Sequence, residues 1–331
     1  MVVGRWSLVV GRWFIRAYSR TFVAKKSVLI RVTRGLSFKK NTMNIKNKLL
    51  IRKIRRAIVS DGTRHVRFGR FFGTFSLEVN REKIPLGDAP LPHPLRLLHL
   101  SDFHASAAVP LDFIARAVAL AVQLQPDLIC ITGDYVTGPL LQGAPAVFTR
   151  YRNILRQLVQ SAPTFSCFGN HDGYVWSPEQ RRCHDNLLVE KLLQESGIRY
   201  CFNASTEVTI KGQPLRIAGL ADLWGQAMAA EEALPPRNAG AELPVILLAH
   251  NPDAKDYLRD YQWDLMLSGH THGGQFRLPF LGAPFAPVRD RQFSEGLHRW
   301  EGRWIHVTRG VGNVHGIRIN CRPQLSLLTL C

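Results

Sequence analysis

The stretch Leu95–His104 reads LRLLHLSDFH, a short apolar run that stops at a polar tetrapeptide. A run of this length, bounded by turn-forming and polar residues, is typical of a strand buried inside a sheet. The residues that follow the run, Ser101–His104, include a carboxylate and an imidazole. This pattern predicts a strand over residues 95–100 that presents polar groups just beyond its carboxyl end.

The same pattern returns four times along the chain. The four further pairs of an apolar run and its polar ending are LICIT with GD at 128–134, TFSCF with GNHD at 164–172, VILLA with H at 245–250, and DLML with SGHTHGGQ at 264–275. Polar residues after the carboxyl ends of successive strands gather along one edge of an α/β sheet, and that edge is where such sheets bind ligands. We therefore expect one site built from five loops.

Helical segments and further strands complete the pattern. Helical periodicity is expected over 111–124, which stops before Pro126, and over 148–159. Further strands are expected over 75–79, 304–308 and 325–330. Strands dominate both ends of this region and helices its middle, which predicts an α/β fold with two packed sheets flanked by helices.

The net charge of +18 is confined to one end of the chain. Residues 1–84 carry 21 Lys and Arg against three acidic residues, whereas residues 85–331 carry 22 of each sign. A hydrophobic fraction of 46% excludes disorder for most of the chain. We expect a basic N-terminal extension over 1–65 and one catalytic domain over 66–331, which is large enough to bury a substantial core.

The extension has the character of a membrane-surface segment. Arginines and lysines interrupt every apolar run before it reaches about 18 residues, so we expect neither a spanning helix nor a signal peptide. Asn44–Val59 places isoleucines and a leucine at mostly helical spacing among basic residues, which predicts an amphipathic helix lying on an anionic bilayer. The alternatives are a solvated helix, a disordered basic tail or an arm that binds single-stranded nucleic acid. Met43 is an alternative start that would leave residues 1–42 outside the protein.

The cysteines indicate a reducing compartment. Their spacing contains no CxxC pair, which argues against a zinc knuckle and a disulfide framework. We expect reduced, mostly buried thiols, and together with the basic helix they predict a cytoplasmic protein held peripherally on the inner face of the cell membrane. The six residues are Cys130, Cys167, Cys183, Cys201, Cys321 and Cys331.

The strand-end residues form a set of oxygen and nitrogen ligands without sulfur. Such a set suits Mn²⁺, Fe or Zn²⁺ better than Mg²⁺. Its members are too many for one ion, whereas two ions about 3.5–4 Å apart, bridged by a shared carboxylate, would use nearly all of them and clamp a phosphoryl group for in-line displacement. Each residue alone would more often have an ordinary structural role, so the prediction depends on the five loops together. The set is Asp102, His104, Asp134, Asn170, His171, His250, His270 and His272.

These blocks resemble a known family. SDFH, GDYVTG, GNHD, LAHNP and SGHTHGGQ are similar to the five signature blocks of the calcineurin-like metallophosphoesterases, over about residues 90–330. The longer SGHTHGGQFRLP and TRGVGNVHGIRINCRPQLSLLTL resemble the bacterial membrane-associated branch of that superfamily. The resemblance implies a four-layer α/β/β/α sandwich of two mixed β-sheets and two divalent metal ions, with Mn²⁺ expected before Fe or Zn²⁺.

The resemblance also implies a role for each ligand-type residue. His171 would lie over the phosphoryl group and protonate the leaving oxygen or stabilise the developing charge. Asp134 would bridge the two metals. The first metal would be held by Asp102, His104, Asp134 and His272, and the second by Asp134, Asn170, His250 and His270.

One position departs from the family pattern. Members with phosphoprotein phosphatase activity have a carboxylate three residues after the bridging aspartate, and it orients the catalytic histidine. This chain has Thr137 there, which leaves Asp172 as a candidate partner of His171. The departure counts against a protein phosphatase and favours cleavage of a phosphodiester or a pyrophosphate.

The same branch implies a substrate. It includes enzymes that cleave the pyrophosphate of UDP-2,3-diacylglucosamine to UMP and lipid X in lipid A biosynthesis, so the expected partners are an anionic membrane surface and a lipid-linked nucleotide. Apolar residues near the last loop are candidates either for contact with an acyl chain or for ordinary packing: Phe276, Leu278, Phe280, Leu281 and Phe285. Arg277, Arg309 and Arg318 are candidates either for phosphate contacts or for plain surface positions.

Two other functions are weighed against this one. A phosphodiesterase or nuclease of broader specificity would use the same scaffold, with the basic arm holding nucleic acid. A non-catalytic interaction module would keep the fold but is expected to lose ligands, and none is missing from this sequence. The metal-dependent phosphohydrolase is therefore the preferred interpretation.

Overall fold

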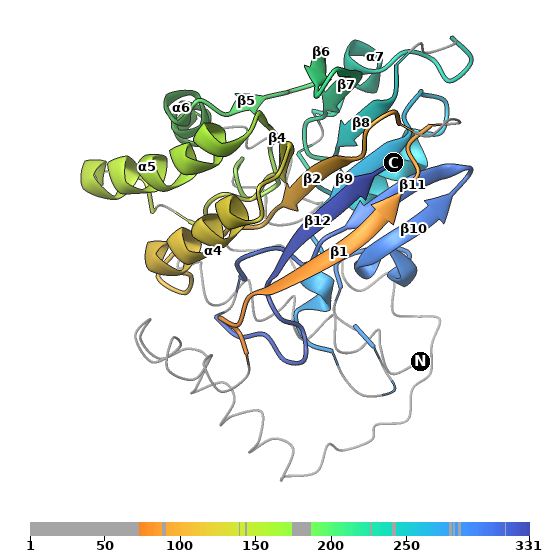
Figure 1. Ribbon diagram of the computed structural model, residues 1–331. Helices are drawn as coiled ribbons and strands as arrows, with labels where there is room; N and C mark the ends of the chain where they lie inside the picture. Colours follow the sequence, from red (N-terminus) through yellow and green to blue (C-terminus); the bar gives the residue numbers. More distant parts are fainter. Residues whose placement is uncertain are drawn as a thin grey trace, which may run out of the picture. The chain divides into compact units, whose positions relative to one another are not determined.

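The computed structural model describes residues 73–87, 91–138, 140–142, 144–173, 187–225, 227–239, 243–277, 280, 282–283, 286–314 and 316–331 (Figure 1). The predicted extension 1–65 with its helix over 44–59 lies outside these residues, as do Cys183, Leu278, Leu281 and Phe285. No helix in the described part of the chain combines the length and the apolar character needed to span a bilayer.

The first sheet holds the first three ligand-bearing strands in its middle. β2, β3, β4 and β5 run parallel to one another, and β12 pairs antiparallel with β2 and parallel with the edge strand β1. In spatial order the strands are β1 (Glu78–Ile84), β12 (Gln324–Leu330), β2 (Leu95–Leu100), β3 (Leu128–Thr132), β4 (Thr164–Cys167) and β5 (Arg199–Tyr200).

The second sheet holds the other two ligand-bearing strands in its middle. β11, β9, β8 and β7 are parallel, and the edge strands β10 and β6 are antiparallel to their neighbours. In spatial order the strands are β10 (Gly296–Trp300), β11 (Arg303–Val307), β9 (Leu265–Ser268), β8 (Val245–Leu248), β7 (Gln213–Gly219) and β6 (Ala204–Ile210).

The two sheets pack face to face, which explains the continuous apolar runs in the sequence. Alternate residues of one strand belong to different layers: Leu97 packs between the sheets, whereas Leu98 faces the helices. A strand covered on both faces needs apolar residues at every position rather than at every second one. Between the sheets, Cys130 and Phe165 pack in the same core as Ile246 of the other sheet.

Helices cover the outer faces. α4 (Leu111–Gln123), α5 (Pro145–Ser161) and α6 (Leu187–Ser196) lie together on the outer face of the first sheet (Figure 1). The short α7 (Ala230–Ala233) and the 3₁₀ helix η1 (Pro252–Tyr257) lie on the outer face of the second sheet with Trp263. The predicted fold class, two mixed sheets flanked by helices, is confirmed.

Several elements were not predicted, and each has a weak local signal. The predicted strand over 75–79 begins at Glu78 instead and continues to Ile84. Its sequence EVNREKI is largely polar because β1 lies at the edge of the sheet, so the apolar pattern that marks a strand is weak there. The β6–β7 hairpin turns at Lys211-Gly212, both with φ near +50° to +80°, a conformation that glycine adopts easily and lysine rarely. With lysine before the glycine, the turn lacks the Asn-Gly pair that usually marks a hairpin in a sequence.

The remaining elements are short. They are the 3₁₀ helices η2 (His272–Gly274) and η3 (Arg291–Ser294). Cys130, Cys167, Cys201 and Cys321 are buried free thiols, and Cys331 is half-buried and free.

Candidate metal centre

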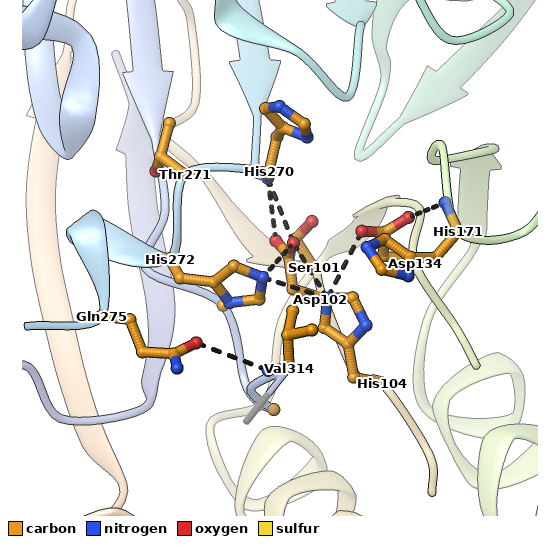
Figure 2. A network of polar contacts seen from close by, with 12 residues as sticks. Ser101, Asp102, His104, Asp134, His171, His270, Thr271, His272, Gln275 and Val314 are labelled. Carbon is orange, nitrogen blue, oxygen red and sulfur yellow. Dashed lines mark hydrogen bonds and ion pairs between the residues drawn. The ribbon is translucent and has the colours of Figure 1, made fainter. Parts of the chain in front are cut away.

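The predicted ligand residues come together at the carboxyl edge of the two sheets. Figure 2 shows six of them: Asp102, His104, Asp134, His171, His270 and His272. The loops after β2, β3 and β4 carry the ligand residues from the first sheet, and the loops after β8 and β9 carry those from the second. Nearly all of these side chains are buried. In chain order they are Asp102, His104, Asp134, Asn170, His171, His250, His270 and His272.

One cluster is formed by Asp102, His104 and His272, whose ligand atoms lie within 4.8 Å of one another. His104 Nε2 and His272 Nε2 lie 3.0 Å apart. Asp102 Oδ1 lies 3.6 Å from the His104 nitrogen and 3.4 Å from the His272 nitrogen. Asp134 Oδ2 adds a second carboxylate oxygen 3.3 Å from His104 Nε2. Imidazole nitrogens this close to each other and to two carboxylates are arranged as ligands around a cation.

A second cluster shares Asp134 with the first. Asp134 Oδ2 lies 3.2 Å from His250 Nε2, so this one oxygen faces a histidine of each cluster. His270 Nδ1 lies 2.9 Å from Asn170 Oδ1. His250 is held from behind, because its Nδ1 lies 2.5 Å from the Thr132 carbonyl, which fixes the tautomer that leaves Nε2 free to act as a ligand.

The ligand residues have an unusual backbone conformation. Asp102, His104, Asp134, His270 and His272 all have φ between +47° and +67°. L-residues adopt this left-handed region at a cost of about 1 kcal/mol or more, and they tend to do so at functional sites. The sharp turn at the end of each strand directs the side chain toward the shared centre instead of along the strand.

Burial and mutual contact control the charge of these groups. Burial alone would raise the pKa of Asp102, but nearby His272 and His104 outweigh it and hold the pKa below its ordinary value. Burial lowers the pKa of His270 to about 3, and it also lowers that of His272. Burial would also lower the pKa of His250, but Asp134 outweighs it and raises the pKa above its ordinary value. Anionic Asp102 and neutral His270 and His272 are in the protonation states that a divalent cation requires of its ligands.

His171 lies beside both clusters. Its backbone N–H donates to Asp134 Oδ1 at 2.8 Å, and its ring packs edge-on against His104 with centroids 4.7 Å apart. One ring nitrogen lies within 4.8 Å of ligand atoms of His104 and Asp134. Burial lowers the pKa of His171 to about 3, although Asp134 opposes the shift. The imidazole is therefore neutral near pH 7.

Thr137, which stands where the orienting carboxylate would be, and Asp172, the candidate partner of His171, both have other contacts. Thr137 Oγ1 lies 2.7 Å from His104 Nδ1, so the threonine supports a ligand histidine. Asp172 Oδ2 accepts from the backbone N–H groups of Asp134 and Gly169, both at 2.8 Å, and its Oδ1 accepts from Tyr135 N–H at 2.7 Å. Burial, with the nearby Asp134 carboxylate, raises the pKa of Asp172 to about 7.

The three arginines considered for phosphate contacts all have protein partners. Arg277 forms an ion pair with Glu295. Arg309 pairs with Glu78 at 2.8 Å and with Glu295 at 3.6 Å. Arg318 is fully buried, and its guanidinium donates to backbone carbonyls. A phosphate contact by any of the three stays a prediction.

A sixth loop, not predicted, also reaches the site. It follows β7 and carries Asp222 and Trp224; the Trp224 ring packs edge-on against His270, with centroids 4.4 Å apart. Asp222 Oδ2 accepts from Trp224 N–H at 2.7 Å, and burial raises the pKa of Asp222 to about 6. The sequence RIAGLAD at 216–222 has the signal of the other loops, an apolar run followed by an aspartate.

The donor set fits two divalent cations. The ligand atoms of two carboxylates and three imidazoles, from Asp102, Asp134, His104, His250 and His272, lie in overlapping groups. The pair of His270 and Asn170 adjoins them, because the His270 ring packs edge-on against that of His250. Bound there, such ions would stabilise charge on a phosphoryl group and lower the pKa of a bound water.

Comparison with known proteins agrees with this chemistry. The family model described as calcineurin-like phosphoesterase matches residues 95–274, more than half of the chain. The chain belongs to the calcineurin-like phosphoesterases. It is thus a hydrolase that acts on phosphoesters, and the order of its five loops is the order of the signature blocks.

The matches to curated relatives span most of the length of each relative. Phosphodiesterase YaeI of Escherichia coli is 43% identical over 237 residues, which is 72% of this chain and 82% of the relative. The uncharacterized metallophosphoesterase YkuE of Bacillus subtilis is 30% identical over 72% of this chain and 81% of its own. The UDP-2,3-diacylglucosamine pyrophosphatase LpxG of Chlamydia muridarum is 25% identical over 76% of this chain and 90% of its own.

Proposed function

We propose that this phosphoesterase hydrolyses phosphodiester-type bonds, including pyrophosphates, with two Mn²⁺ ions held by the two clusters. The observation that carries the proposal is the position of Asp134 Oδ2, within 3.3 Å of His104 Nε2 and 3.2 Å of His250 Nε2. A single oxygen between two sets of ligands is the arrangement of a bridged two-metal site, which suits in-line displacement at phosphorus.

The role proposed for His171 follows from its protonation state. A neutral imidazole with a pKa of about 3 cannot deliver a proton as an imidazolium near pH 7. It can donate an N–H hydrogen bond to an oxygen on which negative charge develops. We therefore assign His171 to charge stabilisation rather than to proton transfer.

The proposed substrate is UDP-2,3-diacylglucosamine, cleaved to UMP and lipid X. Support comes from the relative LpxG, a pyrophosphatase of that lipid, which matches over 90% of its length. A pocket of about 630 Å³ beside the site has room for a substituent of the phosphoryl group. Trp224 belongs both to this pocket and to the contact with His270.

The second candidate is a phosphodiesterase of broader specificity. It is favoured by the higher identity to phosphodiesterase YaeI, 43% against 25% for LpxG. Thr137 contacts His104 and stands where a protein phosphatase would have the carboxylate that orients His171. This residue is compatible with both candidate functions and argues against a protein phosphatase.

A substrate panel separates the two candidates. Purified protein with Mn²⁺ is incubated with UDP-2,3-diacylglucosamine in mixed micelles, a soluble bis-aryl phosphodiester and an aryl phosphomonoester, and Asp134→Ala serves as the blank. Release of UMP at a kcat/KM above that for the soluble diester supports the lipid substrate. Hydrolysis of the diester with the lipid left intact selects the broader phosphodiesterase, and preference for the monoester refutes both.

The proposed location is the inner face of the cell membrane, with the basic segment 44–59 as the contact. Support comes from the confinement of the +18 net charge to residues 1–84. The test is flotation of the full chain with anionic and zwitterionic vesicles, beside a full chain in which Arg52, Lys53, Arg55 and Arg56 are replaced by Ser. Salt-sensitive binding to single-stranded DNA without binding to anionic vesicles would contradict the membrane assignment.

A further inference from the structure

Arg318 is a charged side chain enclosed by the protein without a counterion. Its exposed fraction is 0%, and no ion pair joins it to a carboxylate within the described part of the chain. Burying a charge is costly, and a single carboxylate partner is the usual compensation. Here the closest partners are backbone carbonyl groups. The guanidinium also lies 3.8 Å from Cys321 Sγ and 3.4 Å from His272 Nδ1.

Those carbonyls belong to two segments. The guanidinium donates to Gly312 O at 3.0 Å through Nε, and to Arg309 O at 2.6 Å and Gly310 O at 3.3 Å through Nη2. Nη1 donates to the carbonyl of His272 at 3.3 Å. Arg318 therefore joins the loop 309–312 to a residue of the first cluster.

The loop 309–312 in turn lies against Asp102. Val311 N–H donates to Ser101 O at 2.9 Å, and Gly312 N–H donates to Asp102 O at 2.6 Å. The approach is so close that a Cβ on Gly312 would lie 2.0 Å from the Phe103 carbonyl oxygen, which only glycine permits. The loop thus supports the strand end that presents Asp102.

Both residues reached in this way belong to the first cluster. Asp102 Oδ1 and His272 Nε2 lie 3.4 Å apart, and both residues have left-handed backbone, with φ of 53° and 52°. Residues in this conformation need support from their surroundings to remain in it. Contacts outside the first set of ligands commonly hold metal-binding side chains in place.

We propose that Arg318 is a positioning residue for the first metal site, where it holds His272 directly and Asp102 through the loop 309–312. It acts through these two ligands and does not contact the substrate. The inference rests on the two-metal site but not on the identity of the substrate.

The test is a Mn²⁺ titration of metal-free protein by calorimetry, without substrate. His272→Ala identifies the binding step of the first site, and Asn170→Ala that of the second. Arg318→Met is expected to weaken the first step roughly 10–100-fold and to leave the second unchanged. Arg318→Lys is expected to fall between, because an ammonium has three donors in place of the five of a guanidinium. A wrong substrate assignment would leave these results untouched.

Arg303→Met is the matched control. Arg303 is another buried arginine that donates to backbone carbonyls, those of Leu258 and Tyr261, and its guanidinium stacks on Trp263. Its loss is expected to lower the melting temperature while both Mn²⁺ steps stay at wild-type affinity. A general effect of removing a buried arginine would appear in both variants.

Kinetics separate positioning from a phosphate contact. With saturating Mn²⁺, Arg318→Met is expected to recover kcat with an unchanged KM. A raised KM that excess Mn²⁺ does not correct would overturn the proposal in favour of a direct phosphate contact, and so would two wild-type Mn²⁺ steps in the folded variant. Should Arg318→Met not fold, the same comparisons are made with Arg318→Lys.

Discussion

Asp172 Oδ2 accepts a hydrogen bond from the backbone N–H of Asp134 at 2.8 Å. One buried carboxylate thereby fixes the backbone of the residue whose own carboxylate faces both clusters. Three N–H groups from two loops converge on Asp172, those of Asp134, Tyr135 and Gly169. Asp172 is consequently placed to hold the backbone of Asp134.

Replacement of Asp172 by Asn tests this relationship. The amide turns one acceptor oxygen into a donor that faces an N–H group, so we expect metal affinity and kcat to fall together by roughly 10–100-fold. Metal content and kcat are measured side by side. Asp112→Asn, at an exposed ion pair with Arg150, is the control. Normal metal content combined with a displaced pH–rate profile would instead favour a role in orienting His171.

Asp134→Ala should abolish hydrolysis and weaken both Mn²⁺ steps, because its Oδ2 faces both clusters. Asn170→Ala should weaken only the second step. Circular dichroism and the melting temperature establish that each variant is folded. An unaffected rate in folded Asp134→Ala would refute the two-metal assignment.

Thr137→Val should lower affinity for the first Mn²⁺ roughly 10–100-fold, because it removes the partner 2.7 Å from His104 Nδ1 that fixes the ring. Thr137→Ser keeps the hydroxyl and is expected to retain most of the affinity. The comparison is made by the same titration as for Arg318. Equal loss in the Val and Ser variants would indicate a packing defect instead of a lost hydrogen bond.

His306 should make the protein sensitive to acid. Burial, with a smaller contribution from His298, lowers the pKa of His306 to about 3, whereas an unfolded histidine titrates near 6.5. The unfolded chain therefore binds the proton more readily, so stability is complete above about pH 6.5 and is lost as the pH falls toward 3. The ring lies between the sheets with its Nδ1 2.9 Å from His99 Nδ1.

The variant His306→Asn should show a shallower fall in melting temperature between pH 7 and pH 5 than the wild type. Both proteins are measured without metal. The difference between their slopes therefore reports on His306 and not on the histidines of the metal site. His93→Asn, at an exposed position, should keep the wild-type slope. A slope for His306→Asn equal to the wild type would contradict a buried neutral His306.

The sequence allowed prediction of the parts of the fold in which local pattern and burial coincide. The strands that end in ligand residues are covered on both faces, so their apolar runs were visible, and β2 and β3 have the predicted bounds. β6 alternates between exposed and half-buried positions at the edge of its sheet. An edge strand of this kind has little apolar pattern to detect.

The candidate site likewise has a part that the sequence predicted and a part that it did not. The ligand residues stand in short motifs, so their convergence could be expected from the order of the strands. The contacts of Arg318 and of Trp224 join residues far apart along the chain: Arg318 with His272, and Trp224 with His270. Neither contact has a local signature, because each depends on how two loops pack once both sheets are in place.

Each metal would take its ligands from both sheets. For the first, Asp102 comes from one sheet and His272 from the other; for the second, Asn170 and His270 are divided in the same way. Neither sheet can therefore present a complete set of these residues by itself. The proposed ions would thus join the two sheets, and a chelator should weaken the contact between the sheets before it unfolds either one.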